Sequence, residues 1–233
     1  MREHLLSELD RVVLIADDGR NYLARKYPAF KDKLEVSRLG TTDYSVKKVL
    51  APCGKINLVS CSTVYPVKRL HLIVEALSKI TDISIEWTHY GEGTQLDEIK
   101  DLCKATLPSN VKYSFLGFVE NSQLMKEYTE KPYHLFLNVS ESEGIPVSIM
   151  EALSFGIPCV ATDVGGTGEI ITDKYNGILL GKYFEPATLV EWILYFAKLS
   201  DVEYQRYREN ARQSWQDNYN AEKNYKDFVR TLM

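Results

Sequence analysis

The chain has 233 residues, of which 45% are hydrophobic and 26% are charged, an ordinary composition for a soluble globular domain. Its formal net charge of −4 argues against a broad nucleic-acid interface, because phosphate neutralisation requires clustered lysine and arginine side chains. No apolar stretch approaches the length of a bilayer span, and the N-terminus does not resemble a secretory signal, so the sequence predicts a cytoplasmic protein.

The first 42 residues contain few candidate elements. The predicted elements are a strand at 11–16, a helix at 18–27 and a strand at 34–39. So few elements cannot bury a hydrophobic core alone, so we expect them to dock on another part of the protein. Residues 43–54 include Pro52 and Gly54 and are typical of a linker.

From residue 55 to residue 215, short apolar stretches alternate with amphipathic helix patterns. The predicted strands span residues 56–62, 83–90, 111–118, 133–140, 158–164 and 177–180. Several are nearly continuous in apolar and β-branched residues, as in sheets that are covered on both faces. This alternation predicts an α/β fold with a doubly wound parallel sheet, which is Rossmann-like.

Helices are predicted between these strands from two kinds of pattern, an apolar face and a capping sequence. One apolar helix face is predicted from Leu70, Ile73, Ala76, Leu77 and Ile80. Residues 94–97, Thr-Gln-Leu-Asp, predict a capping box that begins the next helix. At the C-terminus, residues 187–199 and 202–233 are predicted to be helical.

The chain has four cysteines, Cys53, Cys61, Cys103 and Cys159, and none of them stands in a Cys-x-x-Cys pair. We expect all four to be reduced and to serve in packing.

The strongest candidate for chemistry is the loop and helix after the fourth strand of this region. Pro146 suits the first turn of a helix, and Gly156 suits its end. The backbone there would then present amides outward from a helix N-terminus, which is a favourable place for an anion. The residues concerned are Gly144, Ile145, Pro146, Val147 and Ser148.

Two carboxylates flank this helix start. Glu143 lies in the loop before the helix, and Glu151 lies about one turn inside it. A carboxylate can accept two hydrogen bonds, which matches the vicinal hydroxyls of a ribose or another sugar. Taken singly, each glutamate would more often be a solvated surface acid. Their placement across a strand–turn–helix junction favours a functional interpretation.

Several spaced motifs together resemble one family. Glu143 and Glu151 are similar to the Glu-x7-Glu motif of retaining GT-B glycosyltransferases, the large group one family. The likeness continues in residues 156–169, with a Gly-Gly turn followed by Glu169, and upstream in residues 91–93 and 115–118. It covers about residues 55–215 and implies the C-terminal, nucleotide-sugar-binding half of a GT-B enzyme.

The resemblance implies roles for individual residues. Glu151 would bind the ribose of the nucleotide, and Glu143 would contact the donor sugar near the reacting carbon. The amides of residues 144–147 would hold the diphosphate, and Lys68 would neutralise the leaving phosphates. Phe118 and Val119 would border the base.

One position departs from the family pattern. The family often has Gly-Arg five or six residues before the lysine, where the arginine also binds phosphate. This chain has Ser62 and Thr63 there, and we expect Arg69 to compensate.

The implied reaction is metal-independent transfer of a hexosyl-type sugar, with retention of configuration, from a UDP-, GDP- or ADP-sugar to a hydroxyl. No cofactor is implied. The acceptor would be a glycan or a lipid-linked molecule in polysaccharide or lipopolysaccharide biosynthesis, at the inner face of the membrane through peripheral contact of a longer enzyme.

The resemblance also predicts the domain organisation. Residues 1–42 would be a remnant of the N-terminal acceptor domain, and residues 216–233 a helix that crosses back to it. With the rest of that domain missing, we expect this chain alone to bind donor without transferring sugar.

Four other interpretations remain open. A metal-dependent transferase of the other architecture needs an Asp-x-Asp pair, which is absent, although Glu141 and Glu143 could imitate one. A Rossmann dehydrogenase is weaker, because residues 91–93 lack the third glycine of its fingerprint. A GT-B-like sugar-nucleotide epimerase would turn over donor without acceptor. A nucleotide-sugar-binding module would show no turnover.

Overall fold

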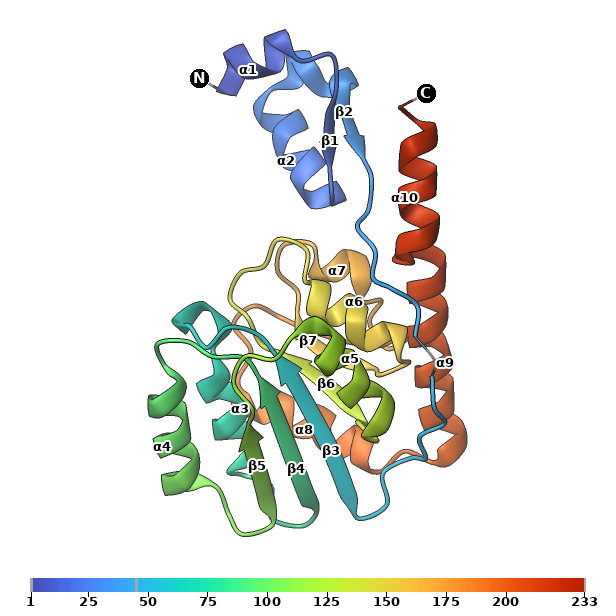
Figure 1. Cartoon of the computed structure of the whole chain (residues 1–233). Helices are drawn as coiled ribbons and strands as arrows, with labels where there is room; N and C mark the ends of the chain where they lie inside the picture. The colour runs from blue at the N-terminus through green and yellow to red at the C-terminus, as the bar shows by residue number, and fades with distance from the viewer. Residues whose placement is uncertain (1, 45, 233) are drawn as a thin grey trace.

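The larger part of the protein is built on a six-stranded parallel sheet (Figure 1). The computed structural model describes residues 2–44 and 46–232. The strands are β3 (Lys55–Cys61), β4 (Ser84–Tyr90), β5 (Val111–Phe115), β6 (Leu135–Asn138), β7 (Cys159–Thr162) and β8 (Gly177–Leu180). They lie in the order β5-β4-β3-β6-β7-β8, and each neighbouring pair is parallel. The predicted doubly wound sheet is confirmed, with its switch point between β3 and β6.

Helices cover both faces of this sheet. One face carries α3 (Leu70–Leu77), α4 (Leu96–Thr106) and α8 (Pro186–Ala197), and the other carries α5 (Asn121–Glu130), α6 (Val147–Ser154) and α7 (Thr167–Ile170). A longer helix, α9 (Asp201–Asn218), packs against α6. The sheet is therefore buried on both sides, which explains why its strands are nearly continuous in apolar residues.

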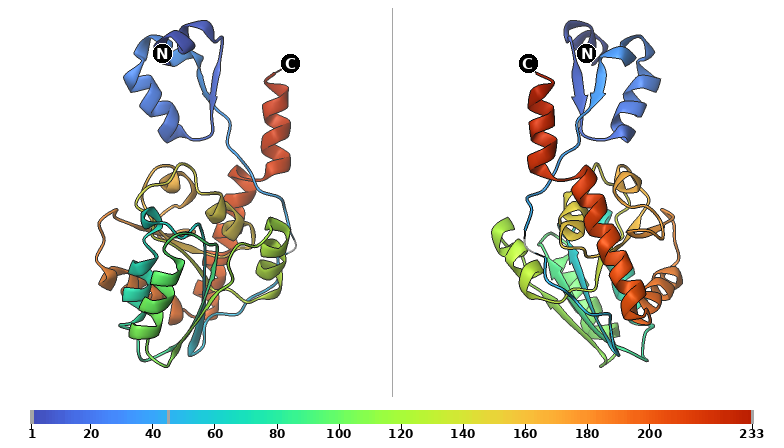
Figure 2. Two further views of the ribbon diagram at one scale, coloured as in Figure 1. Left: turned by 60° about the vertical axis from the view of Figure 1, so that its left-hand side comes forward. Right: turned by 90° about the vertical axis from the view of Figure 1, so that its right-hand side faces the viewer.

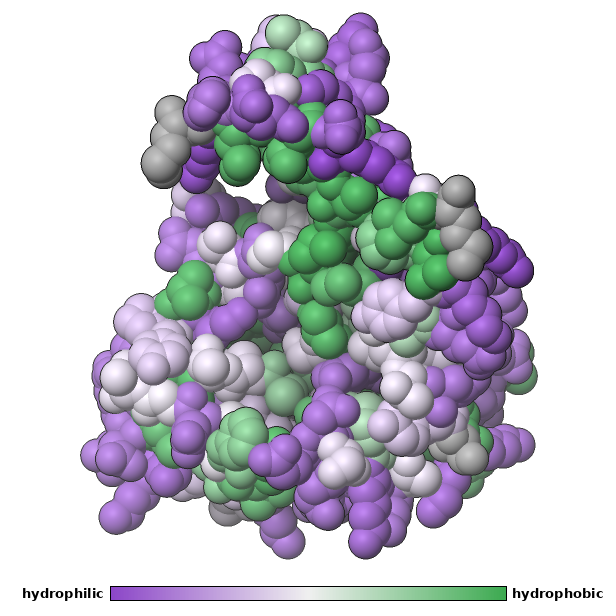
Figure 3. Space-filling model, turned by 45° about the horizontal axis from the view of Figure 1, so that its top comes forward, coloured by the Kyte–Doolittle hydropathy of each residue, from purple (hydrophilic) through white to green (hydrophobic). Residues whose placement is uncertain are grey.

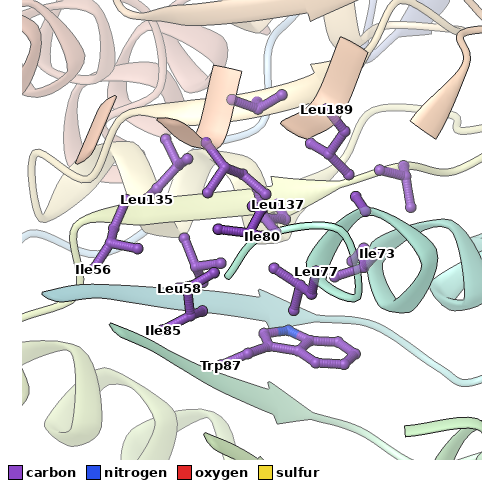
Figure 4. Close-up of a cluster of buried hydrophobic side chains, with 14 of the residues drawn as sticks. Ile56, Leu58, Ile73, Leu77, Ile80, Ile85, Trp87, Leu135, Leu137 and Leu189 are labelled. Carbon is purple, nitrogen blue, oxygen red and sulfur yellow. The ribbon is translucent and has the colours of Figure 1, made fainter. Parts of the chain in front are cut away.

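Residues of every strand except the edge strand β5 feed two separate hydrophobic cores. Leu58 and Leu137 point into the cluster that contains Trp87, as Figure 4 shows. Their neighbours Val59 and Phe136 point the other way, into the cluster around α5 and α6. Both cores consist of side chains that are almost fully buried, so they hold the strands in fixed positions.

The start of α4 differs from the prediction. The helix begins at Leu96 rather than after Thr94, and no side chain caps it. The Gln95 amide donates instead to the carbonyl of Val64, in the loop after β3, at 3.1 Å. This long-range bond holds residues 93–95 in a turn docked on that loop, so the predicted capping box is wrong.

The C-terminal helical region is interrupted. Helix α9 ends at Asn218, and α10 (Ala221–Arg230) begins after Asn220, whose side chain accepts a bond from the Lys223 amide at 3.3 Å. Thr41 inserts at this break: its amide donates to Tyr219 at 2.9 Å, and its carbonyl accepts from Ala221 at 3.1 Å. The expected start of the crossing segment, residue 216, falls inside α9.

Residues 2–36 form a small N-terminal unit. Its elements are α1 (Arg2–Glu8), β1 (Val12–Leu14), α2 (Asp17–Lys26), a 3-10 helix (Pro28–Lys33) and β2 (Leu34–Val36). The strands β1 and β2 form a separate parallel pair. The buried hydrophobic residues in this unit are Leu6, Ala16 and Leu34. As expected, so small a core depends on docking.

The N-terminal unit lies above the sheet domain and beside α10, in both views of Figure 2. Arg11 donates to the Thr231 carbonyl at 2.8 Å, and Asn224 donates to the Leu39 carbonyl at 2.9 Å. Val13 and Ile15 of this unit are partly exposed. Figure 3 shows apolar side chains that extend from the N-terminal unit toward the centre of the face in view.

The structure also tests the predictions about the cysteines and about membrane-spanning helices. All four cysteines are free. Cys103 and Cys159 are buried and Cys61 is half-buried, as expected of packing residues, whereas Cys53 is exposed, so the predicted packing role is wrong for Cys53. Among residues 2–44 and 46–232, no helix combines the length and apolar character that a bilayer crossing requires.

Candidate functional site

Two loops meet at the switch point of the sheet, after β3 and after β6. Lys68 lies in the short 3-10 turn (Pro66–Lys68) that follows β3, and Glu143 lies in the loop that follows β6. The Lys68 ammonium donates to the Glu143 carboxylate at 2.8 Å, and their side chains are only 20% and 10% exposed. The fold thus joins two predicted site residues that lie 75 positions apart.

An unpredicted residue also reaches Glu143. The Asn138 amide nitrogen, at the end of β6, donates to the Glu143 carboxylate at 3.2 Å, and the Asn138 oxygen accepts from the Ser140 amide at 3.1 Å. Asn138 is 8% exposed. Its signal in the sequence was an amide side chain at the carboxyl end of an otherwise apolar strand, where ligands of parallel sheets bind.

Arg69 is placed differently from the prediction. Its guanidinium donates to the carbonyls of Val139 at 2.7 Å, Ser140 at 3.1 Å and Lys182 at 2.9 Å. Its backbone is left-handed, with φ of 50°. These bonds use three of the five guanidinium N–H donors, so Arg69 holds the loops after β6 and β8 together, a structural role that the sequence did not indicate.

The predicted anion-binding helix start is formed by α6. Its first backbone bonds run from Ile149 and Met150 to the Pro146 carbonyl. Val147 and Ser148 precede the first residue whose amide is bonded, because the helix has no carbonyl one turn earlier that could accept their amide hydrogens. Pro146 precedes the helix, and α6 ends as predicted just before Gly156, which has φ of 66°.

The residues of this loop do not all face solvent. Gly144 and Val147 are exposed, Ser148 is half-buried, and Ile145 is buried in the core around α5 and α6. Pro146 is buried as well, so these two residues anchor the loop, while Gly144 before them and Val147 after them remain accessible.

Glu151 is buried rather than on the surface. It is 8% exposed, and its carboxylate accepts a 2.6 Å hydrogen bond from the Asn121 amide at the start of α5. Burial raises the pKa of the Glu151 carboxyl, and the Asn121 hydrogen bond opposes that rise. A buried carboxyl with one donor and one unshared oxygen is suited to bind a hydroxyl.

A cavity of about 940 Å³ lies at the carboxyl ends of β3 and β4. Glu151, Phe118 and Val119 line it together, so three predicted site residues share one space. Phe118 is 67% exposed, whereas Val119 packs partly against the core. The charged residues among its lining are all acidic: Glu92, Asp97, Glu120 and Glu151. Lys68 and Glu143 are not among the lining residues.

Two glycines of the sequence motifs permit close backbone contacts. A Cβ atom at Gly165 would lie 1.9 Å from the Glu143 carbonyl oxygen, and Gly165 has φ of 55°. A Cβ atom at Gly91 would lie 1.9 Å from the Ser62 carbonyl oxygen. The Gly166 amide also donates to the Gly144 carbonyl at 2.6 Å. The Gly-Gly turn therefore supports the loop that carries Glu143.

Glu169, which follows that turn, reaches the N-terminal unit. Its carboxylate accepts bonds from the amides of Asp17 at 2.8 Å and Asp18 at 2.7 Å, at the first turn of α2. Arg38 lies 3.6 Å away and also pairs with Asp17. Glu169 thus caps a helix of the other unit.

The imitation of an Asp-x-Asp pair finds no support here. Glu141 pairs with Lys182 at 3.5 Å, and Glu143 pairs with Lys68 at 2.8 Å. The two carboxylates are thus directed to different lysines.

Comparisons with known proteins agree with this geometry. The family model described as Glycosyl transferases group 1 matches residues 43–214. WcaL of Escherichia coli, a putative colanic acid biosynthesis glycosyltransferase, is 24% identical over 200 residues, which cover 82% of this chain and 49% of WcaL.

Solved structures show the same fold. TarM of S. aureus, in complex with fondaparinux, alpha-GlcNAc-glycerol and UDP, has a TM-score of 0.80 and 19% identity over 97% of this chain and 44% of its own. HepE of Anabaena, in complex with UDP-glucose, has a TM-score of 0.76 and 20% identity over 96% of this chain and 63% of its own.

These neighbours are GT-B glycosyltransferases, and this chain spans about half the length of WcaL and TarM. The family match covers well over half of the chain and includes both motif glutamates, Lys68 and the Gly-Gly turn. The chain therefore belongs to the group 1 glycosyl transferases.

Proposed function

We propose that this chain binds a nucleoside diphosphate sugar and supplies the donor site for retaining, metal-independent transfer of a hexosyl-type sugar to a hydroxyl. The observation that carries the proposal is the arrangement around α6. Glu151 is buried at one side, in a large cavity, and Lys68 pairs with Glu143 at the other side. The unbonded amides of Val147 and Ser148, at the start of α6, lie between Glu143 and Glu151 in the sequence. Such an arrangement suits a ligand that has hydroxyl groups at one end and an anionic group at its centre.

The charge pattern supports an orientation for the ligand. The large cavity has only acidic charged residues, so it would repel a diphosphate and accept the uncharged base and ribose. The diphosphate then falls near Lys68 and the amides of Val147 and Ser148. Phe118 and Val119 would border the base, and Glu151 would accept hydrogen bonds from the ribose hydroxyls.

The proposed reaction depends on electrostatic stabilisation. Without ligand, Lys68 is neutralised by Glu143, and the donor diphosphate would take over the ammonium. The bond from the anomeric carbon to the phosphate oxygen breaks, and the acceptor oxygen bonds to that carbon. The acceptor proton leaves with the released nucleoside diphosphate. Lys68 and the α6 amides would stabilise the charge that develops on the leaving group, and Glu143 would lie near the reacting carbon.

The relatives support a choice of ligand and pathway. The TarM and HepE structures contain UDP and UDP-glucose, so UDP is the first nucleotide to test. WcaL is assigned to colanic acid, so polysaccharide assembly is the proposed setting. Residues 1–42 would belong to the acceptor side, residues 43–54 to the linker, residues 55–215 to the donor domain and residues 216–233 to the returning segment. An acceptor at the inner face of the membrane fits this setting.

The test is a calorimetric panel of UDP, GDP, ADP and their glucose conjugates. We expect one nucleotide series to bind, with the diphosphate tighter than the nucleoside. An assay for sugar release and epimerisation on the same sample separates a transferase donor site from an epimerase. Failure of the whole panel to bind would refute the proposal.

Replacing Glu151 by glutamine is expected to weaken nucleoside diphosphate binding by about 1–3 kcal/mol, the usual loss for charge-assisted hydrogen bonds. The amide keeps the volume of the buried side chain, so α6 should remain folded. Calorimetry measures the affinity, and circular dichroism checks the fold. Unchanged affinity in a folded variant would rule out the ribose-binding role.

A further inference from the structure

We propose that Asn121 is a positioning residue that holds the Glu151 carboxylate ionised and turned toward the ribose. The pairing itself is a property of the ligand-free chain, whereas its effect on ligand binding rests on the proposed function. Asn121 begins α5, directly after the loop of Phe118 and Val119, and it lines the same cavity as Glu151.

The geometry of the pair is specific. The Asn121 amide nitrogen lies 2.6 Å from one Glu151 oxygen, and the two residues come from different helices, α5 and α6. A carboxylate fixed through one oxygen has a defined orientation for the other. Asn121 is itself exposed at the cavity, so it joins the buried carboxylate to the region that a ligand would enter.

The surroundings of Glu151 make this donor important. The charge of Glu151 raises the pKa of Cys61, on β3, and of Tyr128, on α5, although burial is the larger cause for both. The pKa of Cys61 is about 12 and that of Tyr128 is also far above its usual value, so both stay neutral near pH 7. A neutral thiol and a neutral phenol carry no charge that could offset the charge of Glu151. Among the described residues, the Asn121 hydrogen bond is the interaction that favours the ionised form of Glu151.

The pairing predicts a sign for the pH dependence. Burial raises the pKa of Glu151, so nucleotide binding by the ionised carboxylate is lost as pH falls through that raised value. Asn121→Leu removes the donor at similar size and should move this loss to higher pH. Asn121→Asp should reverse the trend, because an acid at position 121 donates only while it keeps its proton.

The experiment follows the Glu151 carboxyl by carbon-13 NMR in the ligand-free chain, with its signal assigned by comparison with Glu151→Gln. The titration midpoint should rise in Asn121→Leu relative to wild type. Ser122→Ala, at the next and exposed position of α5, is the matched control and should titrate like wild type. An unchanged midpoint in Asn121→Leu would overturn the proposal.

Binding is then measured against pH, with UDP or whichever of UDP, GDP and ADP binds best. We expect Asn121→Leu to weaken binding about tenfold at pH 7. Asn121→Asp should bind more weakly as pH rises. Equal affinities and pH profiles in the variants and wild type would overturn the positioning role. If wild type binds no nucleotide while the NMR midpoint still shifts, the pairing is supported and the proposed function fails.

Discussion

Replacing Lys68 by alanine is expected to lower the affinity for a nucleoside diphosphate by about 100-fold and to leave the affinity for the nucleoside nearly unchanged. The Lys68 side chain is four-fifths buried, and among the described residues its ammonium pairs only with Glu143. The anionic diphosphate would be its natural replacement partner, and a charge-assisted bond in such a sheltered place is strong. Any transfer rate should fall about 100- to 1,000-fold, because leaving-group stabilisation is lost.

Two variants control this measurement. Lys182→Ala removes a more exposed lysine that pairs with Glu141, and it should leave both affinities close to wild type. Arg69→Ala removes the donors to three carbonyls, so it should lower the stability of the fold without a specific effect on diphosphates. Calorimetry with UDP and uridine gives the ratio of affinities. Equal losses for both ligands in Lys68→Ala would show that Lys68 acts through packing.

Replacing Gly165 by alanine is expected to destabilise the protein by about 3 kcal/mol. The new Cβ atom would lie 1.9 Å from the Glu143 carbonyl oxygen, and the residue would have to keep φ of 55°. The conflict is with backbone, so the loop must move. Because that loop carries Glu143, the ion pair with Lys68 should be displaced and diphosphate binding should be lost as well.

Gly181→Ala is the matched control for Gly165→Ala. A Cβ atom at Gly181 meets nothing within 4 Å, so this variant should stay within about 0.5 kcal/mol of wild type. Urea unfolding, read by intrinsic fluorescence, gives both stabilities. If the two variants unfolded at the same urea concentration as wild type, the close contact at Gly165 would be contradicted.

The six strands of the sheet could be predicted because each combines a short apolar run with flanking turn residues. The ends of most of them could not, although β8 spans the predicted residues 177–180. The Ser140 amide bonds to the Asn138 side chain, and Pro158 has no amide to donate, so β6 and β7 are shorter than the apolar runs. A side chain thus replaces a ladder bond at the carboxyl end of β6, and a proline removes one at the amino end of β7.

In the candidate site, too, some residues could be predicted from the sequence and others could not. Glu143, Glu151 and Lys68 were predictable because each stands in a motif with fixed local spacing. The partners of the two glutamates were not, since Asn138 and Asn121 meet them only in the folded chain. The failed prediction of a capping box at Thr94 and the unpredicted structural role of Arg69 have this cause too, since the bonds to Val64 and to Lys182 join residues that lie far apart in the sequence.

The chain passes between the N-terminal unit and the sheet domain at two places, and these places touch. Thr41 forms two backbone bonds with the break between α9 and α10, and Gly40 packs against Ala221. Helix α10 is also bonded to the N-terminal unit through Arg11. A rotation of this unit against the sheet domain would therefore bend the chain at both crossings together, and it would have to break the bonds that Glu169 accepts from the start of α2.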